Sequence, residues 1–240
     1  MLDRLNSIKF VMLVSFFSSF ILALVYSGVY DRVQDNIAIY KKQSILKAIG
    51  IDASKLSSDE INLKYEDHIN ELVINKDGEI VDIPLSDIIW KEDKGSGMTD
   101  YLYFDDVNQY LPLYQSKNPD GYIIPISGKG LWSTMMGYFA ISNDKNSSLG
   151  IVFYSHAETP GLGGEVDKEW FQEQFEEDKN KKIFDEFGNL KSIKINKNKN
   201  TQGKKHEVDG ITGATVTSDG LTKFLKRDLE RYLNFLKDEN

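Results

Sequence analysis

The chain has 240 residues, which is enough for one sizeable domain or two small ones. Its formal net charge of -8 supplies no global positive field for phosphates, which argues against nucleic-acid binding. Cysteine is absent, so the chain cannot ligate an iron–sulfur cluster through thiolates, form a disulfide or use a thiol nucleophile.

An uncharged apolar run, FVMLVSFFSSFILALVYSGVY, occupies residues 10–30. At helical rise this run spans roughly 30 Å, the thickness of a bilayer core. A cleaved signal peptide is the alternative, but its apolar core is usually about 7–15 residues long. No A-x-A cleavage site precedes Asp31. The run therefore predicts a single transmembrane helix.

The flanking charges predict the orientation of this helix. Arg4 and Lys9 precede the apolar run, whereas only Arg32 follows it closely. By the positive-inside rule, residues 1–9 are expected in the cytoplasm and residues 31–240 form an extracytoplasmic domain.

The pattern after the apolar run predicts two helices and a hairpin. Residues 31–50 have apolar side chains at helical spacing, and Gly50 is a plausible stop. SSDE at 57–60 resembles a capping box that opens a second helix. VINKDGEIVDI at 73–83 has a D-G turn between apolar pairs, which is typical of a hairpin.

The central part of the chain alternates short strands with polar turns. Three runs rich in aromatic and branched residues predict strands at 121–127, 137–142 and 150–156. An amphipathic helix is expected at 167–178, and a further strand begins at NLKSIKI, residues 189–195. The lysine-rich segment 194–205 is interpreted as a solvated loop.

The last predicted element is a helix over residues 217–237. Its apolar face consists of Leu221, Phe224, Leu225, Leu229, Tyr232, Leu233 and Leu236. This mix of elements predicts an α+β fold with a mostly antiparallel sheet and helices packed on it.

The first of three glycine-rich segments is ISGKGLWSTMMGYFA, residues 126–140. Glycines at 128, 130 and 137 leave backbone exposed and allow positive φ beside Trp132. One interpretation is a tight connection between strands with Trp132 in the core. The other is a backbone wall that a flat ring can approach, with Lys129 offering a cation.

The second segment is SHAETPGLGGEVD, residues 155–167, and it fits neither common nucleotide phosphate-loop pattern. His156 and Glu158 could supply two metal ligands, but no third ligand is evident. A hydrogen-bonded structural pair is the better interpretation. A loop packing over a planar molecule would account for Pro160, Leu162 and the glycines.

The third segment is DGITGATVTS, residues 209–218, in which Thr215 lies just before the final predicted helix. Free N–H groups and the helix dipole favour an anion at such a position. Thr217 or Ser218 could instead be a plain N-cap. That interpretation leaves Asp209, Thr212, Gly213, Ala214 and Thr215 unexplained as a set.

These segments together resemble a known family. D-x-x-T-G-A-T at 209–215 is similar to the acceptor motif for covalent flavin attachment in bacterial flavoproteins with an FMN-binding domain. A membrane helix, GKGLW with GYFAI, HAETPGLGGE and TGATVTS follow one another in the order typical of the C subunit of the sodium-translocating NADH:quinone reductase family. Thr212 stands where many members have serine. The resemblance covers nearly the whole chain.

The resemblance implies a membrane-anchored electron carrier. FMN would be joined to Thr215 through a phosphoester installed by a flavin transferase. It would relay single electrons from an iron centre in the membrane-embedded D and E subunits to the FMN of the B subunit, coupled to sodium export. The resemblance places the chain in the bacterial inner membrane with its soluble domain on the periplasmic side. Alone, the chain should neither oxidise NADH nor pump sodium.

The resemblance also implies a set of cofactor-binding residues, with no catalytic side chain and no metal ligand. The isoalloxazine is expected to contact Glu158, Thr159, Gly161 and Leu162 on one side and Lys129, Gly130, Leu131 and Trp132 on the other. The phosphate is expected to lie among Thr212, Gly213, Ala214, Thr215 and Thr217.

Three alternatives remain open. The G subunit of the Rnf electron-transport complex shares the anchor and the threonine motif, and takes electrons from ferredoxin. A non-redox, membrane-anchored binding or scaffold protein would use TGATVTS only as a turn and helix cap. A hydrolase built on His156 and Glu158 ranks last because it lacks a convincing nucleophile.

Overall fold

The computed structural model describes residues 2–103, 106–107, 110–197 and 200–237. It divides into two compact units, one ending at Tyr40 and one beginning at Lys41. The first unit is part of the continuous helix α1 (Leu2–Ala48), whose apolar side chains from Ile8 to Tyr30 are exposed. The helix is long and apolar enough to cross a membrane, so it is a candidate anchor.

The second unit begins with the last turns of α1 and with a second helix. Ile45 and Leu46 are buried, and the chain leaves the helix at Gly50, where φ is 79°. α2 (Ser58–His68) opens with the expected capping box. The Glu60 carboxylate accepts the Ser57 backbone N–H at 2.8 Å, and the Ser57 hydroxyl accepts the Glu60 N–H at 3.4 Å.

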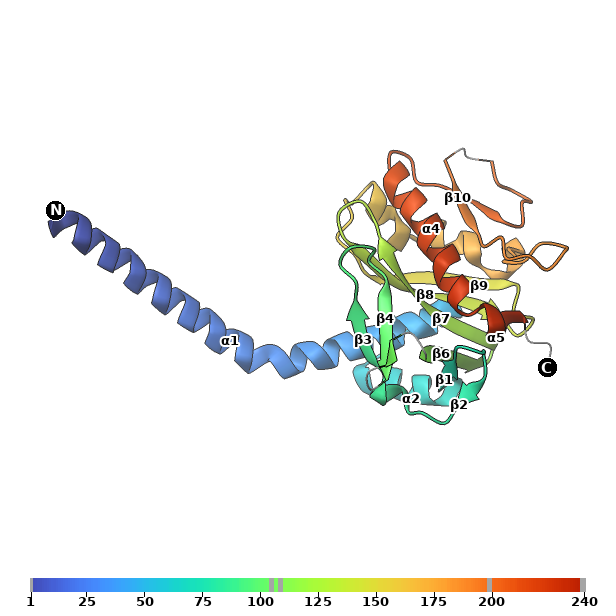
Figure 1. Ribbon diagram of the computed structural model, residues 1–240, viewed down its shortest axis with the longest axis horizontal. Helices are drawn as coiled ribbons and strands as arrows, with labels where there is room; N and C mark the ends of the chain where they lie inside the picture. Colours follow the sequence, from blue (N-terminus) through green and yellow to red (C-terminus); the bar gives the residue numbers. More distant parts are fainter. Residues whose placement is uncertain (1, 104–105, 108–109, 198–199, 238–240) are drawn as a thin grey trace. The chain divides into compact units, whose positions relative to one another are not determined.

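A six-stranded antiparallel sheet forms the centre of this unit, in the order β2-β1-β6-β7-β8-β9 (Figure 1). The predicted hairpin and the three predicted strands are confirmed, although the sequence pattern did not predict β6. The strand bounds are β1 (Ile69–Asn75), β2 (Ile80–Val81), β6 (Tyr110–Lys117), β7 (Asp120–Lys129), β8 (Thr134–Ser142) and β9 (Ser148–Ser155).

Two smaller sheets complete the α+β fold. β3 (Ile89–Glu92), β4 (Thr99–Tyr103) and β5 (Asp106–Val107) are antiparallel and follow a 3-10 turn at Leu85–Asp87. β10 (Lys194–Asn196) and β11 (Glu207–Asp209) form a parallel pair. The strand expected at 189–195 is therefore reduced to a short one, since Ser192 has a φ of 62° that a continuous strand does not allow.

The predicted helix at 167–178 is wrong. The segment contains one short α-helix, α3 (Glu169–Gln172), between 3-10 turns at Gly163–Asp167, Glu173–Phe175 and Glu177–Lys179. Phe171 and Phe175 are buried in the core, as the amphipathic pattern required. The N-cap residue Lys168 makes no side-chain cap. The two buried rings therefore hold this segment on the core although its backbone is not one regular helix.

The final helix differs from its prediction at both ends. α4 (Thr215–Arg231) starts two residues earlier, and the chain breaks at Tyr232 before α5 (Leu233–Lys237). The buried Tyr232 hydroxyl donates to the Pro112 carbonyl at 2.6 Å, so this ring is anchored to the sheet. Most of the predicted apolar face is buried, except that Leu233 is only half-buried.

Helix α4 packs closely on β7 (Figure 1). A Cβ atom at Gly128 would lie 2.3 Å from Cβ of Phe224, and one at Gly220 would lie 2.3 Å from the Lys129 carbonyl oxygen. The two glycines therefore permit a backbone approach that larger residues would block. This approach brings the first turns of α4 beside the end of β7.

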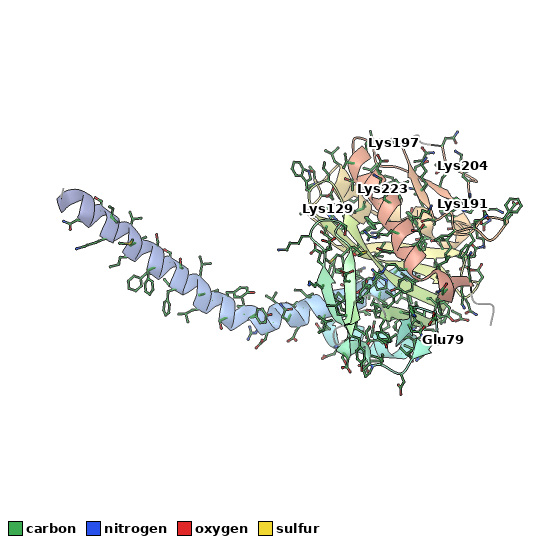
Figure 2. The ribbon with its side chains drawn as sticks, viewed as in Figure 1. Glu79, Lys129, Lys191, Lys197, Lys204 and Lys223 are labelled. Atoms are coloured by element: carbon green, nitrogen blue, oxygen red, sulfur yellow. The ribbon has the colours of Figure 1, made fainter. Side chains whose placement is uncertain are left out.

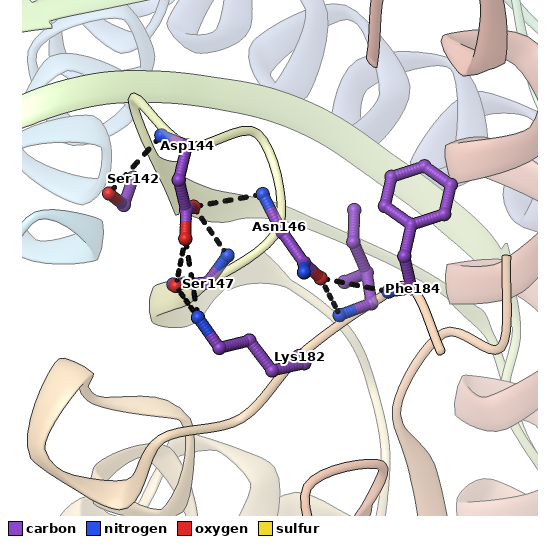
Figure 3. A network of polar contacts seen from close by, with 7 residues as sticks. Ser142, Asp144, Asn146, Ser147, Lys182 and Phe184 are labelled. Atoms are coloured by element: carbon purple, nitrogen blue, oxygen red, sulfur yellow. Dashed lines mark hydrogen bonds and ion pairs between the residues drawn. The ribbon is translucent and has the colours of Figure 1, made fainter. Parts of the chain in front are cut away.

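A polar network closes the turn between β8 and β9 (Figure 3). The Asp144 carboxylate accepts backbone N–H groups of Asn146 at 2.9 Å and Ser147 at 2.7 Å, and Lys182 approaches it at 3.2 Å. Burial alone would raise the pKa of Asp144, but a hydrogen bond from the Ser147 hydroxyl together with these contacts outweighs burial and lowers it to about 2. The network ties the turn to the segment that follows the 3-10 turns.

Candidate functional site

Three segments far apart in the sequence converge on the carboxylate of Glu158. The Trp132 backbone N–H donates to Oε1 at 2.9 Å, and the Leu131 N–H donates to Oε2 at 3.2 Å. The Thr217 hydroxyl donates to Oε2 at 2.6 Å. A longer bond of 3.4 Å comes from the Ser133 N–H. Glu158 therefore joins the β7–β8 connection, its own loop and the first turn of α4.

The charge of Glu158 is satisfied within the chain. The residue is only 5% exposed, and this burial would raise its pKa. The bonds from Thr217, Trp132, Leu131 and Ser133 act in the opposite direction and leave the pKa below its ordinary value. The carboxylate is thus ionised at neutral pH and surrounded by donors.

Two glycines make room for this carboxylate. A Cβ atom at Gly130 would lie 2.5 Å from Glu158 Oε1. One at Gly163 would lie 2.5 Å from Oε2 and 2.6 Å from the Thr217 hydroxyl oxygen. No side chain fits at those distances, so the position of the Glu158 carboxylate explains two glycines of the glycine-rich loops.

The first turn of α4 has no side-chain cap. Its N-cap residue is Ala214, whose side chain has no hydrogen-bonding group, so the alternative that Thr217 or Ser218 is the N-cap is wrong. Thr215 is the first helical residue and is exposed, and it follows Gly213, whose φ is 77°. Because the first intrahelical bond joins the Ser218 N–H to the Ala214 carbonyl, the preceding N–H groups have no intrahelical acceptor. Such a terminus favours an anion.

Exposed apolar side chains occur on all three segments that Glu158 joins. Trp132 is 68% exposed and Leu131 is 50% exposed, so the interpretation of Trp132 as a core residue is wrong. Leu162 and Val216 are also exposed. Leu162 lies against the loop before α4, since a Cβ atom at Gly213 would be 2.9 Å from its Cδ2. These side chains are suited to packing against a flat apolar group.

The Lys129 side chain reaches the loop between β3 and β4. It is exposed, and its ammonium donates to the carbonyl of Lys94 at 3.4 Å, toward the β3–β4 connection (Figure 2).

The Thr159 carbonyl accepts N–H groups of Leu162 and Gly164, both at 3.0 Å, which folds the glycine loop back on itself. Gly161 has a φ of 78° within this turn. Thr212 and Thr159 are both exposed.

A hydrogen bond joins the His156 ring to the backbone of Glu158. The Glu158 N–H donates to Nδ1 of His156 at 3.2 Å, and Nε2 of His156 lies 2.7 Å from an Asp167 carboxylate oxygen. The hydrogen bond with Asp167 raises the pKa of His156, opposed by burial. The Ala157 N–H donates to the Ser133 hydroxyl at 2.7 Å. These contacts support a structural role in holding the loop.

Asp209, the first residue of the threonine motif, also has a structural role. Its carboxylate accepts the backbone N–H groups of Asn200 and Thr201, each at 3.0 Å, and the Thr201 hydroxyl at 2.8 Å. Its own N–H donates to the Gln174 amide oxygen at 2.7 Å. Asp209 therefore fixes the end of the lysine-rich loop before the chain turns toward Thr215.

Sequence reasoning missed Ser133, Gly163 and Asp167 as members of this site. Glycine at 163 was a visible signal, since its lack of a side chain suggests a close approach. The group that approaches it comes from a different segment, so spacing along the chain could not identify it. Sequence reasoning expected Glu158 against the flavin ring, which stays a prediction, and did not foresee that its carboxylate accepts bonds from the chain itself.

The chain is similar to known proteins over most of its length. Residues 130–230 match the FMN-binding domain family. The chain is 31% identical over 232 residues to the C subunit of the Na(+)-translocating NADH-quinone reductase of Vibrio campbellii (strain ATCC BAA-1116), covering 87% of this chain and 84% of that protein. It is 32% identical over 206 residues to the same subunit of Pseudomonas aeruginosa, covering 80% and 78%.

Solved structures agree with the sequence comparison. The crystal structure of the C subunit of the Na(+)-translocating NADH-quinone reductase from Parabacteroides distasonis superposes with a TM-score of 0.70 at 30% identity, covering 88% of this chain and 98% of that one. The structure of Shewanella oneidensis NqrC has a TM-score of 0.64 at 21% identity, covering 82% and 95%, and shows the same fold.

Proposed function

The chain belongs to the family formed by the C subunits of the Na(+)-translocating NADH-quinone reductase, and from this premise we propose that it carries FMN covalently on Thr215. Its relatives are subunits of an oxidoreductase complex. In this proposal the chain is an electron carrier of such a complex, and its own residues bind and orient the cofactor.

The observation that carries the proposal is the exposed hydroxyl-bearing residue at the start of an uncapped helix. Thr215 is exposed, and Ala214 leaves the N–H groups of the first turn without a side-chain acceptor. A phosphate on Thr215 would accept these N–H groups and gain from the helix dipole. Thr212 and Gly213 are also exposed beside this position, so the loop leaves room for an ester.

The charge of Glu158 does not oppose this arrangement. A bare carboxylate near the first turn of α4 would repel a phosphate. Here the carboxylate accepts bonds from Leu131, Trp132 and Thr217, which offset its charge locally. The same bonds hold both expected walls of the flavin site in place before the flavin arrives, which lowers the cost of ordering them.

The exposed apolar side chains of the site would receive the isoalloxazine. We expect Leu162 and Val216 beside one part of the ring system and Leu131 with Trp132 beside another, because all four are exposed in the chain alone. Lys129 would reach the flavin only by giving up its bond to the Lys94 carbonyl, which at 3.4 Å is long. When bound, FMN supplies one-electron transfer chemistry, and the chain supplies position and environment.

Attachment requires one bond to form at Thr215. Its hydroxyl oxygen becomes joined to the phosphorus of a flavin-phosphate donor as the bond from that phosphorus to the donor's leaving group breaks. The leaving group departs with the hydroxyl proton, so the peptide gains the mass of FMN less one water. A flavin transferase supplies the catalysis in this proposal. The imidazole of His156 is engaged by Asp167 and by the Glu158 N–H, so it has no role as a base in this step.

The remaining parts of the proposal concern the complex and the membrane. Helix α1 would anchor the chain in the bacterial inner membrane, with the FMN domain outside the cytoplasm. Electrons would arrive from an iron centre of the D and E subunits and leave to the FMN of the B subunit. The family membership supports a multi-subunit complex as the setting for this transfer.

Mass spectrometry of the peptide that contains residue 215 tests the attachment. The full chain is coexpressed with a flavin transferase in two forms, wild type and Thr215→Ala. We expect FMN less one water on the wild-type peptide, a yellow colour that survives denaturation, and neither in the variant.

Ser58→Ala is the matched control, because it removes an exposed hydroxyl from the first residue of another helix, α2, and leaves the threonine motif intact. It should still carry flavin. A wild-type peptide that stays unmodified beside active transferase would contradict the proposal and favour a binding or scaffold protein. Flavin found on Thr212 would move the site.

A further inference from the structure

The His156 ring has one tautomer that satisfies both of its nitrogens. Nδ1 lies 3.2 Å from the Glu158 backbone nitrogen, which donates, so Nδ1 is unprotonated. Nε2 lies 2.7 Å from an Asp167 carboxylate oxygen, which accepts, so Nε2 carries the proton. The neutral ring thereby connects the 3-10 turn that ends at Asp167 to the backbone of the loop expected to contact the flavin.

The other two of the three histidines have the opposite arrangement. Nδ1 of His68 lies 2.9 Å from the Lys64 carbonyl oxygen, and Nδ1 of His206 lies 2.8 Å from the Lys182 carbonyl oxygen. A carbonyl oxygen only accepts, so both of these rings carry a proton on Nδ1. Each can take a second proton on Nε2 and keep its bond, whereas His156 can take one only on the nitrogen that accepts a bond.

The charges around His156 favour its protonated form. Of the described residues, two charged groups act on the ring, the carboxylates of Asp167 and Glu158, and both are negative. The hydrogen bond with Asp167 raises the pKa of His156 above its ordinary value of 6.5, opposed by burial, since the side chain is only 12% exposed. A proton on Nδ1 therefore removes the bond to the Glu158 N–H and turns the contact with Asp167 into an ion pair.

Bonds on both sides of this contact do not depend on the proton. The Ala157 N–H donates to the uncharged Ser133 hydroxyl at 2.7 Å, and the Glu158 carboxylate accepts the Trp132 N–H at 2.9 Å. Loss of the His156 bond therefore frees one backbone N–H without releasing the loop. The change is local to the start of the second glycine-rich segment.

We propose that His156 is a proton-controlled positioning residue of the flavin site. When neutral it holds the Glu158 N–H, and with a proton on Nδ1 it releases that N–H and pairs with Asp167. One proton is taken from solvent, one hydrogen bond breaks and one ion pair forms, with no change of oxidation state. The exchange belongs to the chain itself, whereas its effect on a flavin rests on the proposed function.

Nitrogen NMR of the full chain in detergent, without flavin and with labelled histidine and glutamate, tests the exchange. At a pH well above 6.5 we expect a bare Nδ1 for His156 and a protonated Nδ1 for His68 and His206, which are the internal controls. The Glu158 amide signal should shift as His156 titrates. A proton on Nδ1 of His156 at high pH, or a Glu158 signal that does not follow the titration, would overturn the proposal.

His156→Asn keeps an acceptor and removes the titrating group. An asparagine side chain accepts from the N–H two residues on, as Asn75 does from the Asp77 N–H at 2.9 Å. The Glu158 amide signal of this variant should therefore not change with pH over the range in which the wild type titrates. A variant that kept the wild-type pH dependence would assign the titration to another group and contradict the role of His156.

Asp167→Asn tests the ion pair. Without the charge of Asp167, the midpoint of the His156 titration should fall by about one pH unit or more. Asp178→Asn is the matched control, because Asp178 is exposed and pairs with Lys179, and it should leave the midpoint unchanged. Equal midpoints in all three chains would mean that no ion pair forms.

The flavin-loaded chain shows whether the exchange reaches the cofactor. Protonated His156 adds positive charge at the site, which favours electron uptake. As pH falls through the titration, the midpoint potential of the wild type should therefore rise more steeply than that of His156→Asn. Parallel curves would overturn the role at the flavin site. Failure of attachment to Thr215 would count against the proposed function, and the NMR measurement would still decide the proton exchange.

Discussion

Glu158 organises the candidate site at the scale of a single residue. Its carboxylate accepts three backbone N–H groups and one hydroxyl from two other segments. Gly130 and Gly163 have no side chain where that carboxylate lies. The position of one side chain therefore determines the arrangement of loops that are far apart in the sequence.

Replacing Glu158 by glutamine tests the hydrogen bonds that the Glu158 carboxylate accepts. An amide would point N–H donors at N–H donors, so we expect a loss of roughly 1–3 kcal/mol in the free energy of unfolding. Flavin incorporation should fall with it, because the two walls are no longer held together. Chemical denaturation of the purified chain measures the first effect, and absorbance of the denatured chain measures the second.

Exposed Glu169 supplies the control for this substitution. Glu169→Gln removes the same charge from the surface and should change stability by no more than about 0.5 kcal/mol. If both variants were equally stable, the hydrogen bonds of Glu158 would not have the importance given to them here.

Gly130→Ala tests the space beside the same carboxylate. The added methyl would lie 2.5 Å from Glu158 Oε1, so we expect a cost of about 1–3 kcal/mol from overpacking. Gly95→Ala is the comparison, since its methyl would meet only the exposed side chain of Asp93 at 3.3 Å. Thermal melting of the two variants should show a clear shift only for Gly130→Ala.

At the scale of elements, α4 connects the site to the rest of the domain. Its first turn carries Thr215 and the Thr217 hydroxyl, its middle packs Phe224 on Gly128, and Tyr232 after its end bonds to the sheet. The helix is thus fixed along its length against β7 and β6. A rigid helix gives a rigid position for whatever is attached to its first residue.

Asp144, in the turn between β8 and β9, should make the stability of the folded chain depend on pH. The pKa of Asp144 is lowered from 3.8 to about 2, so the ionised form stabilises the folded state above the ordinary value. That contribution is lost as pH falls from about 4 toward 2. We expect Asp144→Asn to be less stable than the wild type at neutral pH.

The difference in stability between Asp144→Asn and the wild type should shrink as the pH is lowered through this window. Denaturation curves at several pH values measure it. A difference that stayed constant down to pH 2 would mean that the ionised carboxylate contributes nothing through its hydrogen bonds.

At the scale of the whole molecule, the chain consists of two units that differ in how far they bury their apolar side chains. The first is a helix with exposed apolar side chains, and the second has its own core. The end of α1 belongs to the second unit, because Ile45, Leu46 and Ile49 are buried there. A Cβ atom at Gly150 would lie 2.4 Å from the Ala48 carbonyl oxygen, which indicates close packing on β9.

Two truncations test this division. A chain that begins at residue 41 should stay in solution without detergent and melt cooperatively. A chain that begins at residue 51 loses several buried apolar side chains, each contributing about 1.5–3 kcal/mol, and should be strongly destabilised. Detergent-free purification and thermal melting measure both outcomes. Similar melting of the two chains would show that the end of α1 is not part of the core.

Much of the architecture could be predicted from the sequence because its causes are local. The apolar run predicts the long helix, the Ser57–Glu60 pair predicts the start of α2, and aromatic and branched runs predict β7, β8 and β9. The segment 167–178 was predicted correctly in its buried side chains, Phe171 and Phe175, but not in its backbone, which forms one short helix and 3-10 turns.

The sequence by itself determined the family, the α+β class, the candidate anchor and the threonine motif, because each can be recognised from residue types and their order along the chain. Only the tertiary structure decided that Ala214 occupies the N-cap of α4 and that Glu158 joins three segments. Contacts of this kind depend on how distant backbones approach one another, and side-chain spacing along the chain carries no record of that approach.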